Sequence, residues 1–443
     1  MGLKTAKFGG TSLADAAQIR KVQAIVESDP DRRYVVPSAP GKRTKDDRKI
    51  TDLLYLCHDH ARQRIAIDEV WSLIADRYRQ IVSELGLKLD LTPALDETRT
   101  RIEETGANGG TADFAASRGE YLNGLIIAEL LGYTFVDAAE VIFFTEQGRL
   151  DTARTYEAVG RRLGSLQRAV VPGFYGAMPD GSIKTFSRGG SDISGAIIAR
   201  GVKADVYENW TDVSGLLMAD PRIVENPRVI ETITYKELRE LAYMGATVLH
   251  DEAVFPVREA GIPVNIRNTN DPEAPGSLIF RGGTTAKPTQ FAISGIAGRK
   301  DFTVLALEKA MMNAELGFGR RVLSALEVNG VSYEHTPSGI DTMSVVIADD
   351  QLKGKLDKVL DDIRVECRPD ALDVFPGMAL IATVGRGMAH VPGTAAKVFN
   401  ALAQARINVR MIDQGSSEIN IIVGVETADF ERAVRAIYAA FVG

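Results

Sequence analysis

The chain begins with the stretch LKTAKFGGTS at residues 3–12, which decides the fold. Residues 3–8 have the pattern of a short β-strand, and apolar residues recur at helical spacing from about residue 12 to residue 27. Gly9 and Gly10 lie between these two predicted elements. Two glycines allow backbone N–H groups to approach phosphate oxygens, and the start of a helix attracts negative charge. The stretch therefore predicts a phosphate-binding bend at the end of a strand.

Lys7 lies near the end of the predicted strand and supplies a cation beside this bend. Its ammonium group would lie where the β- and γ-phosphates of a nucleotide are held. The alternative interpretation is an ordinary strand–turn–helix with a lysine on the surface. The chain contains no Gly-x4-Gly-Lys-Ser/Thr segment, so a P-loop enzyme is not indicated.

The alternation of strand and helix continues, and we expect residues 1–280 to form one catalytic domain. Further strands are predicted at residues 34–37, 134–137, 169–171 and 204–208, and helices at residues 50–60, 119–131 and 191–200, with a mostly helical insert that ends near residue 102. Such alternation predicts an α/β fold, in which a mostly parallel sheet is sandwiched by helices.

The composition is that of an ordinary globular protein, with 443 residues, 45% of them hydrophobic and 25% charged. Its formal net charge of −7 provides no broad basic field, so neither nucleic acid nor an anionic membrane is an expected partner. Only two cysteines occur, Cys57 and Cys367, which argues against a disulfide framework and fits a reducing compartment. Without a signal-peptide core or an apolar run near the ~20 residues of a membrane span, we expect a soluble cytoplasmic protein.

The C-terminal third repeats one order of elements. Residues 281–290 are rich in glycine, threonine and proline and are expected to be a linker. The order strand–helix–strand–strand–helix–strand then occurs twice, which predicts two βαββαβ (ferredoxin-like) units. We assign the first unit to residues 302–370, with strands at residues 331–335 and 364–367 among its four.

The second unit, residues 376–443, lacks its last strand because the sequence stops at Gly443. The apolar segment 291–297 precedes the first unit. We expect this segment to supply the missing strand, which would interlock the two units.

A second glycine pair, Gly189 and Gly190, opens a predicted helix directly after Arg188. The pair provides another bend that can accommodate an anion, and a guanidinium group pairs with a carboxylate through two parallel hydrogen bonds. The alternative is a glycine-rich loop with a solvated arginine. Because two helix-opening glycine pairs occur in one α/β domain, we interpret both as phosphate-binding.

Three other segments allow more than one interpretation. Glu120 lies in the first turn of a predicted apolar helix and could pair with a substrate ammonium, or it could only complement the helix dipole. Residues 208–222 follow a predicted strand as a long polar loop, where open sheets bind nucleotides, although a simple connection would look the same. Cys57, His58 and His60 suggest a metal site, but neighbouring positions point to different faces of a helix, so a packed helix is the simpler interpretation.

In their order along the chain, these motifs resemble those of the aspartate kinases, members of the amino-acid kinase superfamily that carry tandem ACT domains. The matching segments are residues 7–12, 117–120, 188–192, 211–215 and 220–222. The resemblance covers nearly the whole chain. It implies an amino-acid-kinase fold for the first part and two ACT units, which bind regulatory amino acids, for the second.

The resemblance also implies a role for individual residues. Lys7 and Asp192 would be the catalytic pair. The substrate aspartate would be bound by Ser38, Thr51, Glu120 and Arg188, with Glu120 on its ammonium group and Arg188 on its α-carboxylate. The nucleotide would be bound by Gly9, Gly10, Gly189, Gly190, Thr211, Asp212, Leu217, Asp220 and Arg222. A regulatory amino acid would be bound by Met312, Glu315, Gly317, Phe318 and Gly319.

The implied reaction converts ATP and L-aspartate into ADP and 4-phospho-L-aspartate, the first step toward lysine, threonine and methionine. Mg²⁺ would be carried by the nucleotide, without a metal site made by the protein itself. Lysine or threonine would be the feedback effector. Regulatory units of four to five strands often pair edge to edge, so we expect a homodimer or a larger homo-oligomer.

Two positions depart from the common pattern of the family. Leu217 stands where many relatives have tyrosine, and Thr247 where many have lysine, and both changes affect the expected ATP contacts. One alternative is another amino-acid or carbamate kinase of the same superfamily, against which the tandem units and the pair of Glu120 and Arg188 argue. The other is a non-catalytic amino-acid sensor, which the retention of Lys7 and of both glycine pairs disfavours.

Overall fold

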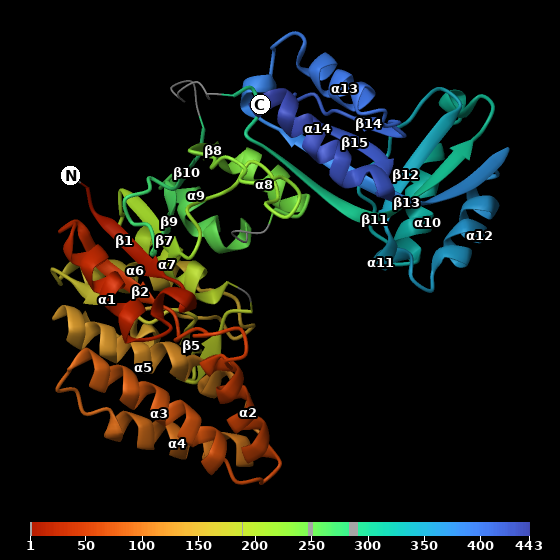
Figure 1. Ribbon diagram of the computed structural model, residues 1–443. Helices are drawn as coiled ribbons and strands as arrows, with labels where there is room; N and C mark the ends of the chain where they lie inside the picture. Colours follow the sequence, from red (N-terminus) through yellow and green to blue (C-terminus); the bar gives the residue numbers. More distant parts are fainter. Residues whose placement is uncertain (1, 188, 247–250, 283–290) are drawn as a thin grey trace. The chain divides into compact units, whose positions relative to one another are not determined.

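The computed structural model describes residues 2–187, 189–246, 251–282 and 291–443 (Figure 1). The chain divides into two compact units. The first contains Met1–Leu216, Val229–Tyr235 and Val248–Thr285, and the second contains Leu217–Arg228, Lys236–Thr247 and Ala286–Gly443. Two short segments from the first 280 residues therefore group with the C-terminal part of the chain. Residues 283–290 of the expected linker lie outside the described residues.

The first unit is built on an eight-stranded sheet with the order β3-β4-β2-β1-β7-β9-β10-β8. Its strands are β1 (Lys4–Phe8), β2 (Arg32–Pro37), β3 (Thr134–Phe135), β4 (Ala169–Val170), β7 (Val206–Thr211), β8 (Thr232–Thr234), β9 (Val264–Asn268) and β10 (Ser277–Phe280). All neighbouring strands are parallel except β9 and β10. The predicted mostly parallel sheet is therefore confirmed. A separate hairpin is formed by β5 (Tyr175–Ala177) and β6 (Ile183–Thr185).

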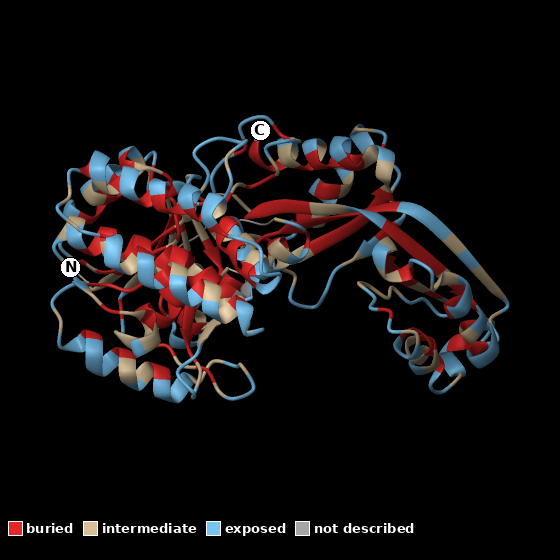
Figure 2. Ribbon diagram, turned by 90° about the horizontal axis from the view of Figure 1, so that it is seen from below, coloured by how far each residue is buried: buried red, intermediate tan, exposed pale blue. Residues whose placement is uncertain are grey.

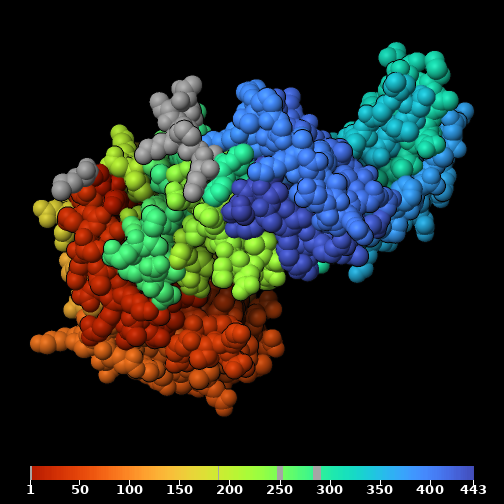
Figure 3. All heavy atoms as spheres, turned by 45° about the horizontal axis from the view of Figure 1, so that its top comes forward, coloured from red at the N-terminus to blue at the C-terminus, as the bar shows by residue number. Residues whose placement is uncertain are grey.

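Helices cover both faces of this sheet, and Figure 2 shows the buried residues concentrated on the strands and on the inner sides of the helices. Phe8 and Trp210 belong to a core cluster with the apolar sides of α1, α3 and α5, whereas Val36 packs in a second cluster with α6 and α7. The helices are α1 (Ala16–Glu27), α2 (Ile50–Arg62), α3 (Asp68–Leu85), α4 (Thr92–Ala107), α5 (Asp113–Leu131), α6 (Thr152–Gly164), α7 (Gly190–Gly201), α8 (Tyr235–Tyr243) and α9 (Phe255–Ala260). The insert helices gather on one side of the unit, in orange in Figure 3.

The first helix starts later than predicted. A short 3-10 turn at Gly10–Leu13 starts at the second glycine of the pair, and α1 begins at Ala16. Asp15 explains the difference, because its carboxylate accepts a hydrogen bond of 2.9 Å from the Gln18 amide and so caps the helix.

The second unit contains a five-stranded antiparallel sheet with the order β12-β11-β13-β15-β14. Its elements are β11 (Gly295–Glu308), α10 (Phe318–Val328), β12 (Thr342–Ala348), α11 (Asp349–Leu352), α12 (Leu356–Cys367), β13 (Ala371–Val384), α13 (Thr394–Gln404), β14 (Met411–Asp413), β15 (Asn420–Glu426) and α14 (Phe430–Val442). The start of β11 pairs with the end of β13, with Gly295 opposite Val384 and Ala297 opposite Ala382. Residues 295–297 therefore pair with the first strand predicted in the second repeat, and they form one continuous strand, β11, with the strand predicted at residues 302–308.

Two strands predicted in the first repeat are wrong. Residues 364–367 form the last turn of α12, because Val359, Ile363 and Cys367 are buried at a spacing of four residues and so lie on one helical face. Residues 331–335 form only an isolated bridge between His335 and Val346. The Val331 amide instead donates to the Leu326 carbonyl at the end of α10.

Within the described residues, none of the helices combines the length and the apolar character that crossing a membrane requires.

Candidate active site

Lys7 and Asp192 form an ion pair at the centre of the first unit. Lys7 lies on β1 and is 7% exposed, and its Nζ is 2.5 Å from Asp192 Oδ1 in the first turn of α7. The central strands hold this pair, because Lys7 lies directly opposite Asn209 in the parallel pairing of β1 and β7. Two residues separated by 185 positions, and predicted to act together, are thus in contact.

The first glycine pair lies beside the ammonium group of Lys7. A Cβ atom on Gly9 would be 3.5 Å from Lys7 Nζ, and the Gly9 amide donates to the Trp210 carbonyl at 2.9 Å. A Cβ atom on Gly10 would be 3.0 Å from the Ala39 carbonyl oxygen. The bend therefore passes between the loop that follows β2 and the end of β7, with little room for a side chain at Gly10.

The second glycine pair opens α7. Gly189 has a φ of 56°, in the left-handed region, and a Cβ atom on Gly190 would lie 2.3 Å from Phe174 Cδ2. Both positions therefore favour glycine. The first N–H groups of a helix have no intrahelical acceptor, so the start of α7 offers donors beside the Lys7–Asp192 pair. Arg188 lies outside the described residues.

Glu120 is a buried carboxyl group on α5. It is 5% exposed, its Oε2 has no hydrogen-bond partner in the described part of the chain, and the Ser191 hydroxyl is 3.5 Å from its Oε1. Burial raises the pKa of Glu120 to about 8, an effect that the Ala39 amide and the Ser191 hydroxyl partly offset. A buried carboxyl group with an unused oxygen is suited to receive a cation.

Ser38 and Thr51 lie where the chain contacts α5, the helix that carries Glu120. The Ser38 amide donates to the Phe8 carbonyl at 3.0 Å, and its carbonyl accepts from Asn123 Nδ2 of α5 at 2.7 Å. Thr51 lies in the first turn of α2, next to Ile50, which approaches α5 at Gly119. Both side chains are half-buried.

The predicted nucleotide residues divide between the two units. Thr211 ends β7 and Asp212 follows it, with the Thr211 hydroxyl 3.2 Å from Asp212 Oδ1. Leu217, Asp220 and Arg222 belong to the segment Leu217–Arg228 of the second unit, where Arg222 Nη2 pairs with Asp220 at 2.6 Å.

Comparisons with known proteins bear on this site. A model of the amino acid kinase family matches residues 4–268, and an ACT domain model matches residues 381–441. Aspartokinase 3 of Bacillus subtilis is 40% identical over 450 residues, which are 99% of this chain and 98% of that protein. The crystal structure of Clostridium acetobutylicum aspartate kinase is 57% identical, covers 99% of this chain and 100% of its own, and gives a TM-score of 0.92.

Two structures of E. coli aspartokinase III are also similar. Both are 26% identical to this chain; the complex with aspartate and ADP covers 99% of each chain with a TM-score of 0.71. The complex with lysine and aspartate covers 100% of each chain with a TM-score of 0.73. The chain belongs to the aspartate kinases of the amino acid kinase family. The resemblance read from the motifs is thus confirmed.

The predicted effector loop of this aspartate kinase lies in the second unit. Met312 and Phe318 are buried, and Gly317 has a φ of 78° at the start of α10, where Gly319 follows. Glu315 pairs with Lys309 at 2.8 Å and with Arg321, and its hydrogen bond with Lys309 lowers its pKa.

Asn209 and Tyr207 also contact Asp192, and the sequence did not single them out. Asn209 Nδ2 donates to Asp192 Oδ1 at 2.9 Å, and the Tyr207 hydroxyl donates to the Asp192 carbonyl at 3.0 Å. Alternate residues of a strand point to opposite faces, so a residue two positions before Thr211 shares its face. That alternation was the available signal, but it does not reveal which helix covers the face.

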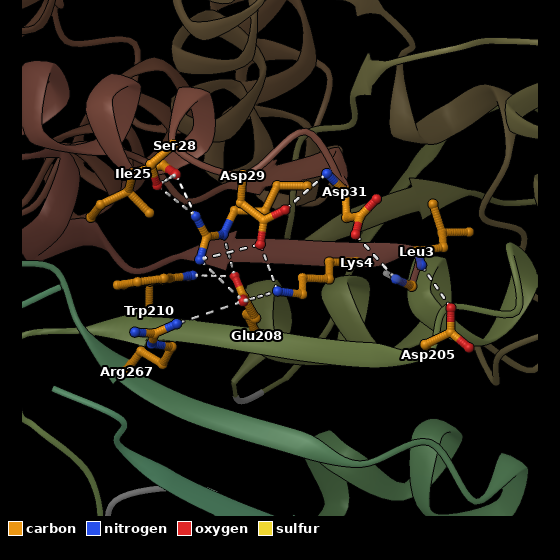
Figure 4. Close-up of polar contacts among 12 residues, drawn as sticks. Leu3, Lys4, Ile25, Ser28, Asp29, Asp31, Asp205, Glu208, Trp210 and Arg267 are labelled. Atoms are coloured by element: carbon orange, nitrogen blue, oxygen red, sulfur yellow. Dashed lines mark hydrogen bonds and ion pairs between the residues drawn. The ribbon is translucent and has the colours of Figure 1, made fainter. Parts of the chain in front are cut away.

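The opposite face of β7 carries a buried cluster of charges (Figure 4). Glu208 accepts hydrogen bonds from Arg32 Nε at 2.7 Å and Trp210 Nε1 at 2.9 Å. Lys4 and Arg267 lie 3.6 and 3.9 Å from its other carboxylate oxygen. This cluster joins β1, β2, β7 and β9 on the side of the sheet away from Lys7.

The cysteine and histidine group on α2 is packed against its neighbours. Cys57 and His58 are buried, and His58 Nε2 is 3.0 Å from the Gly110 carbonyl oxygen. Burial raises the pKa of the Cys57 thiol to about 12. Throughout the described ranges, no three His, Cys, Asp or Glu side chains gather as a metal ion would require.

Proposed function

We propose that this aspartate kinase transfers the γ-phosphoryl group of ATP to the side-chain carboxylate of L-aspartate, with Lys7 and Asp192 as its catalytic residues. The observation that carries the proposal is the contact of 2.5 Å between Lys7 and Asp192, beside two glycine bends and the open start of α7. The names of the Bacillus and Clostridium relatives support the same reaction.

The chemistry requires two anions to meet. The β-carboxylate of aspartate is ionised near neutral pH, so no general base is needed. Two unit charges ~4 Å apart repel by about 4 kcal/mol at an effective dielectric constant near 20. Lys7, the amides of Gly9 and Gly10, and Mg²⁺ that arrives on the phosphates of ATP would offset this repulsion. Asp192 would keep the ammonium group of Lys7 directed at the bend.

Glu120 and Arg188 would fix the zwitterionic end of aspartate, leaving the side-chain carboxylate free to react. The unpaired Oε2 of Glu120 supports its pairing with the substrate ammonium group. Arg188 would hold the α-carboxylate in two parallel hydrogen bonds, and Ser38 and Thr51 would line the pocket. The aspartate bound in the E. coli relative is consistent with this substrate.

For the nucleotide, we assign Gly9, Gly10, Gly189, Gly190, Thr211, Asp212, Leu217, Asp220 and Arg222. The ADP in the E. coli complex supports a nucleotide site in the family. The catalytic domain would comprise residues 1–280, joined by residues 281–290 to a first ACT unit at 302–370 and a second at 291–297 with 376–443.

Regulation by an amino acid is a further part of the proposal. Lysine or threonine would bind near Met312, Glu315, Gly317, Phe318 and Gly319 and favour a less active state. The E. coli relative was solved with lysine, which supports this effector class. The working form would be a cytoplasmic homodimer or larger homo-oligomer.

The test is ADP release by the purified protein with ATP, Mg²⁺ and one acceptor at a time: aspartate, glutamate or acetylglutamate. Of the three acceptors, we expect only aspartate to support turnover. This turnover should be lost in Lys7→Ala, while the circular dichroism spectrum remains that of the folded protein. Preference for another acceptor, or near-normal activity of Lys7→Ala, would refute the proposal. Titration with lysine and threonine tests regulation, and no inhibition by either would remove that part.

A further inference from the structure

Asn209 contacts Asp192 from β7, the strand that pairs with Lys7's own strand, β1. It is 4% exposed on β7, and its Nδ2 donates to Asp192 Oδ1 at 2.9 Å. The same oxygen atom is 2.5 Å from Lys7 Nζ. One carboxylate oxygen therefore receives an ammonium group from β1 and an amide group from β7.

The backbone of Asp192 is held from the same strand. The Tyr207 hydroxyl donates to the Asp192 carbonyl at 3.0 Å, and a Cβ atom on Gly195 would lie 2.6 Å from that hydroxyl. Helix α7 is therefore in close contact with β7. Asn209 and Tyr207 together fix both the main chain and the side chain of Asp192.

We propose that Asn209 is a positioning residue for phosphoryl transfer, whose amide fixes the Asp192 carboxylate so that the Lys7 ammonium group points to the Gly9–Gly10 bend. This inference rests on the proposed function. A neutral donor suits the task, because a cation here would compete with Lys7 for Asp192. An acid would repel Asp192 and the incoming anions.

Few titratable groups face this position in the described part of the chain. They are Lys7 from β1, Asp192 from α7 and Tyr207 from β7 itself, while β9 presents the apolar Ile266 opposite Asn209. Glu120 of α5 lies beyond the Ser191 hydroxyl. A second carboxyl group at position 209 would therefore be coupled chiefly to Asp192 and Lys7.

Asn209→Asp tests the inference, because the new carboxyl group has the same shape as the amide. At acidic pH the two carboxyl groups share a proton, so the new group still donates a hydrogen bond to Asp192. As pH rises the proton is lost and the two carboxylates repel. We expect the ratio of variant to wild-type kcat to fall about tenfold or more between about pH 6 and pH 9, with a small change in the KM for aspartate.

Asn209→Leu removes the donor without adding charge, so its kcat should be lower by about tenfold or more at every pH. Asn329→Asp is the matched control. Asn329 Nδ2 donates to Asp362 Oδ2 at 2.7 Å in the second unit, so this variant creates the same pair of carboxylates, but one that does not involve Lys7. Its kcat ratio to wild type should not change with pH.

A kcat ratio for Asn209→Asp that stays constant from about pH 6 to pH 9 would overturn the role of Asn209. So would a kcat for folded Asn209→Leu within twofold of the wild type. Failure of the wild type itself to release ADP with aspartate would instead refute the proposed function, so the two failures are distinguishable.

Discussion

The buried carboxyl group of Glu120 is suited to bind a cationic ligand, but its ionisation destabilises the folded protein. Burial raises its pKa to about 8, whereas a glutamate in an unfolded chain titrates near 4.3. The folded protein therefore holds the proton of the Glu120 carboxyl group more tightly than the unfolded chain does. The stability that it contributes is fully present below about pH 4 and is lost as pH rises through about 8. A substrate ammonium group beside the carboxylate would offset this loss of stability at high pH, because it stabilises the ionised form of Glu120.

We expect Glu120→Gln to be more stable than the wild type at pH 8, by on the order of 2–3 kcal/mol, and equally stable at pH 4 to 5. Its KM for aspartate should rise at least tenfold, because an amide cannot neutralise the ammonium group. Urea unfolding at both pH values and steady-state kinetics measure these effects. Glu129→Gln, at an exposed position of the same helix, is the control and should show neither. Equal stability of Glu120→Gln and wild type at pH 8 would contradict this account.

Gly190 tests how tightly the start of α7 is packed. A methyl group there would lie 2.3 Å from the Phe174 ring and 3.2 Å from the Phe174 Cα atom, and Phe174 already has a φ of 82°. Gly190→Ala should therefore lower the free energy of unfolding by about 1–3 kcal/mol and reduce kcat. Gly164→Ala, in α6 with open space around it, is the matched change and should stabilise by up to about 1 kcal/mol. Similar denaturation midpoints for both variants would show that Phe174 moves aside freely.

At the scale of elements, periodicity predicted most of the strands and helices, and the misses have physical reasons. Residues 364–367 were predicted as a strand, although this short segment mixes charged and apolar residues. In the structure, Ile363 and Cys367 complete the buried face of α12. Glycine pairs mark the segments that contain Lys7 and Asp192, whereas Glu120 lies in the third turn of α5 and was assigned through the family motif. Asn209 could not be singled out from the sequence, because its partner Asp192 lies on α7 and the order of elements along the chain does not reveal that α7 packs against β7.

The two faces of β7 carry different groups of polar residues. Lys7 and Asn209 point to α7, while Glu208 and Trp210 point to the opposite face, where the charge cluster of Figure 4 lies. Arg32 also donates to the Ile25 carbonyl at 2.5 Å, near the end of α1. The cluster therefore ties a helix and four strands together behind the site.

We expect Glu208→Gln to lower the free energy of unfolding by about 3 kcal/mol, because buried Arg32 would lose its closest counter-charge and, among the described residues, keep only Asp29, at 4.0 Å. The kcat of the folded enzyme should stay within about twofold of the wild type, since the cluster lies on the other face of the sheet. Asp29→Asn, which removes the partly exposed partner of Lys4, should cost at most about 1 kcal/mol. A large fall in kcat in Glu208→Gln without a loss of stability would reverse the assignment of the two faces.

At the scale of the whole molecule, the chain passes between the two compact units after residues 216, 228, 235, 247 and 285. Helix α8 follows β8 without a break, so that Tyr235 belongs to the first unit and the rest of the helix to the second. Within the second unit, Glu237 of α8 is buried and accepts from the Ser294 hydroxyl at 2.6 Å and from the Arg386 amide at 2.7 Å. Unfolding of the second unit should therefore release a helix that is covalently continuous with an edge strand of the catalytic sheet.

Glu237→Gln tests this coupling, because it removes the charge that Arg386 Nη1 contacts at 3.0 Å. We expect a loss of about 2–3 kcal/mol in stability and a parallel fall of several degrees in the temperature at which kinase activity is lost. Glu240→Gln, one turn later on the same helix, is the matched control. Glu240 accepts a hydrogen bond from the neutral Asn420 amide, so no ion pair is lost in this contact. The variant should change stability by less than about 1 kcal/mol. Glu237 belongs to the second compact unit. Kinase activity that outlasts the calorimetric unfolding of this unit in Glu237→Gln would therefore show that α8 does not couple the two units.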